Sequence, residues 1–212
     1  MCRLLAVKDR RPFAIAPLLA AFAAMAKSSP EYQGDGWGCA WRDGAGWNAY
    51  HSLTPVWADD LARFGETHLL VVHARSAFRN EGIAVENNMP FLAGGLAFAF
   101  NGELHGVRIR EEGRIGAEKV FNTVRRLASG DLGAGLARAA AVIVARSRHV
   151  RAMNVVLCDG ERILAHSSFA ERPEYFTVHV AAGGGRVAVC SEPLGGADGW
   201  RAMDNGATEV FA

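Results

Sequence analysis

The sequence predicts an α+β fold in which β-sheets pack together and helices cover them from outside. The chain has 212 residues, half of them hydrophobic, which suits one globular unit with a sizeable core. Strand-like segments occupy both ends of the chain, and two helical stretches at 116–129 and 132–147 separate them. This order is typical of stacked sheets with outer helices. We expect a single domain over residues 1–212, because no repeat, linker or low-complexity tract interrupts the chain.

The first half of the chain alternates apolar segments with turns rich in glycine, proline and serine. A short strand at 3–7 precedes an alanine-rich amphipathic helix at about 14–26, which Ser28-Ser29-Pro30 ends. The further elements expected in this half are a hairpin of strands 37–41 and 47–51 joined by residues 42–46, a short helix at 59–64, and strands at 69–75 and 94–100, the last ending abruptly at Asn101-Gly102.

The second half opens with the two helical stretches. Ser129-Gly130-Asp131 separates them, as a stop for the first helix and a cap for the second. The last third of the chain is strand-like, and Asp159-Gly160 fits a tight turn between its first two strands. The four strands are expected at 153–158, 162–167, 175–180 and 186–190.

Composition excludes several classes of function. The formal net charge is +1 and no dense Lys/Arg run occurs, so we expect no nucleic-acid partner. No apolar run reaches the length of a membrane span. The cysteines are widely spaced, without Cys-x-x-Cys or a Cys/His cluster, so we expect no metal, no other cofactor and the reduced thiols of a cytoplasmic protein. The four are Cys2, Cys39, Cys158 and Cys190.

An export signal is the competing interpretation of the first residues. Lys8, Arg10 and Arg11 precede an apolar stretch at 13–25, and Ala24-Met25-Ala26 resembles a cleavage site. Such a signal would remove Cys2 and make this an exported protein of unknown role. The would-be basic region is itself apolar, however, and the apolar residues of 15–25 fall on one helical face, which favours a helix of the mature fold.

Cys2 stands directly behind the initiator Met1. If Met1 is removed, one residue carries both a thiol and a free α-amine. An α-amine has a pKa of about 7.7–8.0, so it can accept the thiol proton near neutral pH, with water as a bridge. This pairing yields an activated sulfur nucleophile without a histidine.

Two further segments carry residue types suited to acyl-transfer chemistry. Arg75 ends a buried strand and can present a planar fork of donors to a substrate carboxylate, although a structural ion pair is the alternative. Asn101 and Gly102 follow an apolar strand, where an amide and a backbone N–H can stabilise an oxyanion. A hairpin turn is the alternative for Asn-Gly. The glycines of 34–38 suit a substrate edge or a plain loop.

Together these segments resemble class II glutamine amidotransferases, which are N-terminal nucleophile hydrolases. Within that family the chain is most similar to the compact stand-alone branch that includes the γ-glutamyl amidohydrolase of ergothioneine biosynthesis. The motifs that carry the resemblance, in the family's order, are Met1-Cys2-Arg3-Leu4-Leu5, Asp35-Gly36-Trp37-Gly38, His73-Ala74-Arg75, Glu86-Asn87-Asn88-Met89-Pro90-Phe91 and Asn101-Gly102-Glu103-Leu104, with further agreement at 153–157, 162–165, 191–193 and 199–200. The resemblance implies a four-layer αββα sandwich.

It also implies a γ-glutamyl amide as the small-molecule substrate. Cys2 would attack the γ-carboxamide carbon, with its α-amine as base and then acid, and Asn101 and Gly102 would hold the oxyanion. Arg75 would bind the α-carboxylate, and we expect Asn88 and Glu118 to contribute to substrate binding. Water would then cleave the γ-glutamyl thioester, releasing glutamate after ammonia or an amine has left. The ammonia would be released or passed to a separate synthase subunit.

Two positions depart from the family pattern. Gly116 stands where the family has an aspartate that holds the substrate's α-ammonium, and Met89 stands where a histidine is usual. A cation that loses its paired carboxylate binds less well. Either the substrate lacks a free α-ammonium, or Glu118 or one of the residues 111–112 replaces the aspartate. The alternative to an enzyme is a non-catalytic ligand-binding protein of the same fold.

Overall fold

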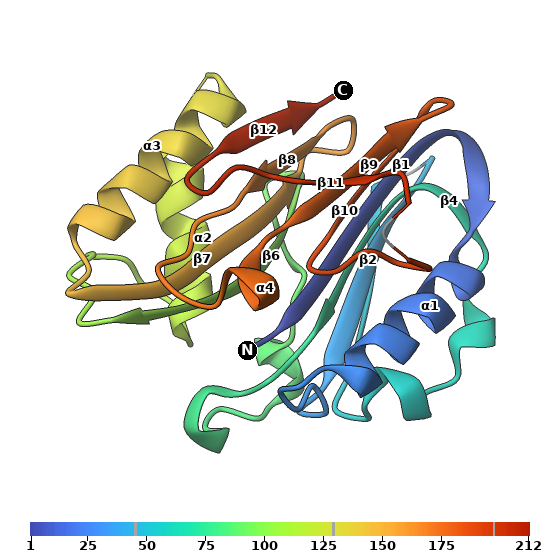
Figure 1. The fold of residues 1–212 in the computed structure, drawn as a ribbon, viewed down its shortest axis with the longest axis horizontal. Coiled ribbons are helices and arrows are strands. Elements are labelled where there is room, and N and C mark those ends of the chain that lie inside the picture. Colours follow the sequence, from blue (N-terminus) through green and yellow to red (C-terminus); the bar gives the residue numbers. More distant parts are fainter. Residues whose placement is uncertain (45, 129, 197) are drawn as a thin grey trace.

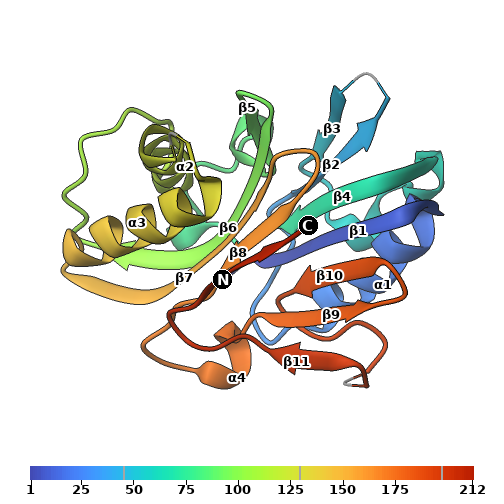
Figure 2. The ribbon, with the colours of Figure 1, turned by 90° about the horizontal axis from the view of Figure 1, so that it is seen from above.

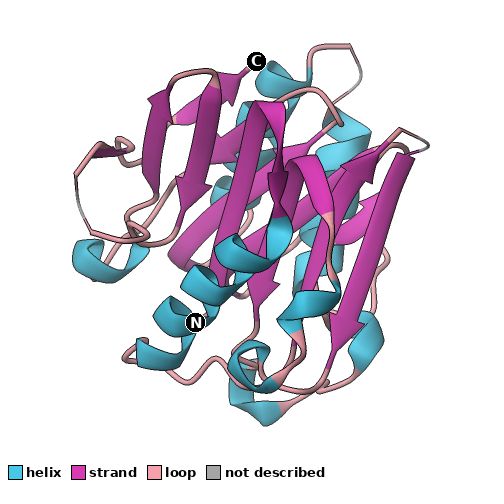
Figure 3. Cartoon of the chain, turned by 90° about the vertical axis from the view of Figure 1, so that its right-hand side faces the viewer, coloured by secondary structure: helices cyan, strands magenta, loops and turns pink. Residues whose placement is uncertain are grey.

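Two antiparallel sheets face each other, and helices cover their outer faces (Figures 1 and 2). The computed structural model describes residues 1–44, 46–128, 130–196 and 198–212. Strands from both ends of the sequence are neighbours in the larger sheet, since β1 lies between β10 and β4. Figure 3 shows the strands of the larger sheet with the first helix in front of them. The expected αββα sandwich is therefore confirmed.

The larger sheet has the strand order β11-β9-β10-β1-β4-β2-β3 and the smaller has β12-β8-β7-β6-β5. Antiparallel ladders join all of these neighbours. The strands are β1 (Arg3–Ala14), β2 (Trp37–Asp43), β3 (Gly46–Ser52), β4 (Glu66–Ala74), β5 (Phe91–Ala93), β6 (Leu96–His105), β7 (His149–Cys158), β8 (Ile163–His166), β9 (His179–Gly183), β10 (Arg186–Cys190), β11 (Trp200–Ala202) and β12 (Thr208–Phe211). The α-helices are α1 (Ile15–Ser28), α2 (Gly116–Leu127), α3 (Leu132–Ala145) and the short α4 (Pro173–Phe176).

Successive side chains of a strand point to opposite faces of its sheet, and this alternation produces the layers. In β1, Leu5 and Val7 are buried beneath α1, whereas Leu4 and Ala6 are buried between the sheets. The predicted first helix is confirmed as α1, and Phe22 on its inner face belongs to the same core cluster as Leu5. No helix in the described part of the chain is long and apolar enough to cross a membrane.

β6 shows the same alternation in the second sheet. Ala97 belongs to the cluster between the sheets, and small side chains there let the sheets approach closely. Phe98 faces outward and stacks on Phe121 of α2, with ring centroids 4.7 Å apart. The two central helices are confirmed, and the Asp131 carboxylate caps α3 by accepting hydrogen bonds from the N–H groups of Gly133 and Ala134. Ser129, predicted in the break between α2 and α3, and Ala45, predicted in the β2–β3 turn, lie outside the described residues.

Several predicted boundaries were wrong. β1 continues to Ala14 instead of ending near residue 7. The strand predicted at 175–180 is instead α4 followed by β9, because Pro173 at the first helical position favours a helical turn there. The short helix predicted at 59–64 is two 3₁₀ turns at Val56–Ala58 and Leu61–Arg63. The short strands β5, β11 and β12 were missed, because three or four residues carry too little periodicity.

The most consequential correction concerns Asn101-Gly102. These residues do not form a turn, because β6 runs on to His105 and pairs with β7 along its length. Asn101 lies opposite Asn154, and Gly102 lies opposite Met153. The hairpin alternative is therefore wrong. Long-range pairing with β7, which is about fifty residues away in the sequence, overrides the local turn preference of Asn-Gly.

Candidate active site

A cavity of about 700 Å³ opens where the start of β1, the end of β4, the middle of β6 and the start of α2 meet. We call it the Cys2 cavity. Cys2, Arg75 and Gly102 line it, so three of the predicted site residues share one space. Strand register brings the first two together, because Arg3 of β1 pairs with Ala74 of β4. The residues just outside this pair, Cys2 and Arg75, therefore lie side by side.

The Cys2 sulfur rests against the backbone of Ser76. Ser76 N–H points at Sγ from 3.5 Å, and Sγ lies 3.6 Å from the Ser76 carbonyl oxygen. Burial raises the pKa of the Cys2 thiol, while the chain's terminal amine, the Ser76 N–H and Arg75 act in the opposite direction. The sulfur is thus a half-buried thiol that needs a nearby base to become a nucleophile.

The other three cysteines are fully buried and serve as small apolar residues of the core. Burial raises the pKa of Cys39 and of Cys190 to about 12 in each case, and it raises that of Cys158 further. They are therefore unreactive thiols.

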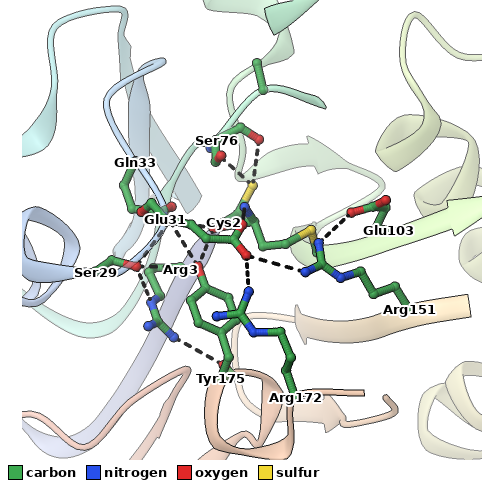
Figure 4. A network of polar contacts seen from close by, with 12 residues as sticks. Cys2, Arg3, Ser29, Glu31, Gln33, Ser76, Glu103, Arg151, Arg172 and Tyr175 are labelled. Atoms are coloured by element: carbon green, nitrogen blue, oxygen red, sulfur yellow. Dashed lines mark hydrogen bonds and ion pairs between the residues drawn. The ribbon is translucent and has the colours of Figure 1, made fainter. Parts of the chain in front are cut away.

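A dense polar network holds the first residue of the chain (Figure 4). The Met1 amine forms an ion pair with Glu31, and Glu31 also pairs with Arg172. The Met1 carbonyl oxygen accepts hydrogen bonds from Tyr175 Oη at 2.7 Å and from Gln33 Nε2. Burial opposes ionisation of Glu31, yet hydrogen bonds from the amine and from Arg172 lower the pKa of that carboxyl.

Arg3 anchors the same network from beneath. Its guanidinium lies 4.1 Å from the centre of the Tyr175 ring and donates to the Tyr175 carbonyl oxygen at 3.3 Å. It also pairs with Glu192 at 3.1 Å. The sequence did not single out Glu31, Gln33 or Tyr175, because these residues lie 30 to 174 positions away from Met1 and follow no motif. In the chain with Met1 present, the Cys2 nitrogen is an amide and cannot act as a base.

Asn101 is fully buried, and neither atom of its amide has a hydrogen-bond partner among the residues that the structure describes. Leaving a buried polar group unpaired costs about 1–3 kcal/mol. Because Asn101 alternates with Phe100 and Gly102, its side chain projects from β6 toward the first sheet, which carries Cys2. Asn101 is not among the residues that line the Cys2 cavity, so its unpaired amide lies next to the site and not on its wall.

Gly102 lines the cavity at a point where the backbone leaves no room for a side chain. A Cβ at this position would lie 2.4 Å from the Ala152 carbonyl oxygen and 2.4 Å from the Phe100 ring. The glycine is therefore required by the close approach of β7, and it leaves the backbone open to the cavity.

Arg75 is buried, and its guanidinium forms no ion pair with a carboxylate of the described residues. Only 6% of its surface is exposed, Nη1 has no partner, and Nη2 reaches the Glu81 carbonyl oxygen at 3.4 Å. Burial lowers the pKa of the guanidinium. Within the described residues Arg75 forms no ion pair, so the structural-pair alternative finds no support. A buried, unpaired guanidinium on a cavity wall is suited to bind an anion.

The glycine-rich segment at 34–38 positions this arginine. The Arg75 N–H donates to the Gly36 carbonyl oxygen at 2.9 Å, and the Asp35 N–H donates to the Arg75 carbonyl oxygen at 3.2 Å. The Asp35 carboxylate in turn accepts from Ala77 N–H at 2.7 Å. The segment is thus held by hydrogen bonds to the end of β4 and fixes its position. This structural role was not among the two alternatives drawn from the sequence, which were a substrate edge and a plain loop.

Asn88 and Glu118 are not among the residues that line the Cys2 cavity. Asn88 is buried and donates to the Ser52 carbonyl oxygen at 2.8 Å. Glu118 is held by Arg114, with a contact of 2.8 Å to the guanidinium and 2.6 Å to the backbone N–H. Met89 does line the cavity, as does Gly116, where an added Cβ would meet nothing within 4 Å.

No group of three His, Cys, Asp or Glu side chains within the described ranges is arranged to hold a metal ion. The groups that line the cavity include the Cys2 thiol, the Gly102 backbone and the Arg75 guanidinium. Such a set can support nucleophilic attack on a carbonyl carbon, with stabilisation of the resulting oxyanion and recognition of a carboxylate.

Comparison with known proteins agrees with this geometry. The family model described as class-II glutamine amidotransferases matches residues 1–179. No curated protein matches the chain. The fold is similar to a glutamine aminotransferase class-II domain protein of Silicibacter pomeroyi, with a TM-score of 0.67, 20% identity and 100% of both chains covered.

Two further solved structures share the fold. A predicted glutamine amidotransferase of Pseudomonas aeruginosa has a TM-score of 0.61 and 18% identity, over 99% of this chain and 97% of that one. The glutamine phosphoribosylpyrophosphate amidotransferase of B. subtilis has a TM-score of 0.63 and 15% identity, over 90% of this chain and 42% of that one. Because the family model covers most of the sequence and the sandwich fold agrees with it, this chain belongs to the class II glutamine amidotransferases.

Proposed function

We propose that the chain hydrolyses the γ-amide bond of a γ-glutamyl compound, with Cys2 as nucleophile once Met1 has been removed. The observation that carries the proposal is the convergence on one cavity of the Cys2 sulfur, the Gly102 backbone and the unpaired Arg75 guanidinium, with the orphaned Asn101 amide directed toward the same sheet. Buried polar groups are normally paired, so an unpaired guanidinium and an unpaired amide at this place support a role in binding.

The reaction proceeds in two steps. The Cys2 thiol gives its proton to the α-amine of the same residue, and the sulfur bonds to the γ-carbonyl carbon. Asn101 Nδ2 and the Gly102 N–H donate to the oxyanion, and the α-ammonium returns the proton to the departing nitrogen as the C–N bond breaks. Water, deprotonated by the amine, then cleaves the thioester. The products are ammonia or an amine and the free γ-carboxylate, while Arg75 holds the α-carboxylate throughout.

The network around Met1 suits this mechanism. Removal of Met1 leaves Gln33 Nε2 and Tyr175 Oη without the carbonyl oxygen they bind, next to the new amine of Cys2. Donors directed at an amine favour its neutral form, which is the form that can accept the thiol proton. Met1 also lines the Cys2 cavity, so its removal enlarges the space beside the sulfur.

The decisive experiment compares the Met1-less chain with Cys2→Ala, which offers an equally small residue to the processing peptidase. Intact mass establishes removal of Met1 in both. The wild-type chain is expected to gain one adduct from a glutamine-like electrophile and to turn over at least one γ-glutamyl amide, and Cys2→Ala to do neither. Equal turnover by the two proteins would exclude Cys2 as the nucleophile. Cys158→Ala, which removes a buried thiol, serves as the matched control and is expected to keep the adduct.

A non-catalytic ligand-binding protein is the second candidate, and Gly116 favours it because no aspartate stands there to hold an α-ammonium. This candidate predicts that γ-glutamyl amides raise the melting temperature without being consumed. Ammonia release by the purified chain alone distinguishes hydrolysis from transfer to a separate synthase subunit. We also propose a cytoplasmic location in the stand-alone branch of the family, since the four described cysteines are free thiols.

A further inference from the structure

We infer, as an extension of the proposed function, that the substrate carries no free ammonium. The geometry points to a γ-amide of an N-acylated glutamate, in which the α-nitrogen is uncharged and bears an apolar acyl group. Three features of the Cys2 cavity lead to this class: the balance of its unpaired charges, the space at Gly116 and the apolar wall beside that space.

The cavity wall has an excess of unpaired cations. Arg75, Arg79 and Lys119 line it, and none of them forms an ion pair within the described part of the chain. Arg79 instead lies over the Phe78 ring, with its guanidinium carbon 5.1 Å from the ring centre. Arg79 is solvent-exposed and therefore screened, so the buried Arg75 and the half-buried Lys119 carry most of the effect. A substrate ammonium placed beside these two cations is repelled, whereas a second anionic or neutral polar group is not.

Most carboxylates near the cavity already form ion pairs with arginine side chains of the protein. After removal of Met1, Glu31 still pairs with Arg172 and lies 3.6 Å from Arg151, and Glu103 pairs with Arg151 at 3.0 Å. The three glutamates considered as replacements for the missing aspartate do not line the cavity. Glu118 is bound to Arg114, Glu111 is bound to Arg126, and Glu112 is exposed. Among the described lining residues, the carboxylate outside any ion pair is that of Glu81, which is solvent-exposed.

Gly116 opens α2 on the cavity wall, and an added Cβ there would meet no atom within 4 Å. Gly116 is itself solvent-exposed, so the missing side chain leaves a gap where the cavity wall meets solvent. Apolar side chains also line the cavity, and they come from the end of β6, the segment that follows it and the start of α2. They are Leu104, Val107, Ile109, Ile115, Ala117 and Val120.

An apolar wall beside an uncompensated cation cluster suits a ligand that is anionic at one end and apolar at the other. With a volume of about 700 Å³, the cavity lies within the range of about 300–1,000 Å³ that encloses drug-sized ligands, so an acyl group fits beside the glutamate part. In this arrangement Arg75 holds the α-carboxylate, and the acyl group occupies the gap at Gly116.

The test is a comparison of kcat/KM for three amides by the Met1-less chain: glutamine, N-acetylglutamine and N-hexanoylglutamine. We expect both N-acyl amides to exceed glutamine by at least about tenfold, with the hexanoyl compound best. A wild-type preference for free glutamine, or equal values for all three, would overturn the inference while leaving the proposed function intact. Absence of turnover on every amide, together with no adduct on Cys2, would instead refute the proposed function.

Gly116→Asp tests the position of the missing charge, with Gly116→Asn as the neutral control of the same shape. Both side chains fit the open space and are tolerated in the first turn of a helix. Gly116→Asp is expected to raise kcat/KM for glutamine and to lower it for the hexanoyl compound, so that their ratio changes by at least about tenfold. Gly116→Asn should lower the hexanoyl value without improving glutamine.

Glu81→Gln examines the remaining free carboxylate. If Glu81 held an α-ammonium, this variant would raise the KM of glutamine alone, and that result would contradict the inference. We expect the variant to leave the ratio of N-acyl amide to glutamine unchanged within about twofold, because an exposed carboxylate at the rim is screened by solvent.

Discussion

Asn101→Leu is expected to make the protein more stable and less active at the same time. Leucine has a similar size, and it removes an amide that is fully buried with both polar atoms unpaired. Relief of this desolvation cost is worth about 1–3 kcal/mol, and in a chain of this size each kcal/mol raises the melting temperature by about 2–4 °C. Loss of one oxyanion donor should reduce kcat by about 10²–10³.

Asn154→Leu is the matched control, because Asn154 faces Asn101 across the β6–β7 ladder and is equally buried. Its amide is satisfied, since Nδ2 donates to the Phe176 carbonyl oxygen at 2.6 Å and Oδ1 accepts from Ser168 N–H at 3.1 Å. Removing it leaves the buried Phe176 carbonyl and the half-buried Ser168 N–H without these partners, so this variant should lose about 1–3 kcal/mol.

Urea unfolding and thermal melts of the two variants give the free energies, and steady-state hydrolysis gives kcat. Opposite signs of the stability change are the expected result. If Asn101→Leu destabilises the protein as much as Asn154→Leu does, then the Asn101 amide is satisfied in the free protein. It would then be a structural group, and the oxyanion assignment would lose its main support.

Three further predictions concern other residues of the site. Gly102→Ala should destabilise the protein by about 1–3 kcal/mol in urea unfolding, because the new methyl group meets the Ala152 carbonyl oxygen and the Phe100 ring at 2.4 Å. An unchanged unfolding midpoint would show that β7 can move to make room for the methyl group. Arg75→Lys should raise KM by about 10–100-fold with a smaller effect on kcat, since lysine cannot form the two parallel hydrogen bonds that a guanidinium offers to a carboxylate. Stability should fall steadily as pH drops from 6.5 toward 3, because burial lowers the pKa of His73 to about 3 and that of His166 to about 4, while the unfolded chain binds both protons near 6.5. His73→Asn should reduce this dependence, most clearly toward pH 3. A wild-type midpoint that is constant over this range would contradict the assignment.

Local chemistry was accessible from the sequence. A cysteine behind Met1, an arginine at the end of an apolar strand and an Asn-Gly pair are visible as residue types, and their meaning depends on few neighbours. The layers of the fold could be predicted for the same reason. The strand at 69–75 and the helix at 116–129 show local patterns of apolar residues, and the same residues are buried in the structure.

The tertiary structure alone decided which residues face the cavity. Asn101-Gly102 has the local preference of a turn, but pairing with β7 makes it a strand and buries the amide. Glu118 was a candidate for substrate binding by its place in the sequence, yet Arg114 four residues away engages its carboxylate.

The sequence by itself therefore determined the candidate nucleophile, the alternation of layers and the family. Only the folded chain decided which charges are paired, since ion pairs such as Glu31 with Arg172 join residues 141 positions apart. The physical reason is that reactivity is a property of a residue type and its immediate neighbours, whereas the electrostatic balance of a cavity is a sum over side chains delivered by distant segments.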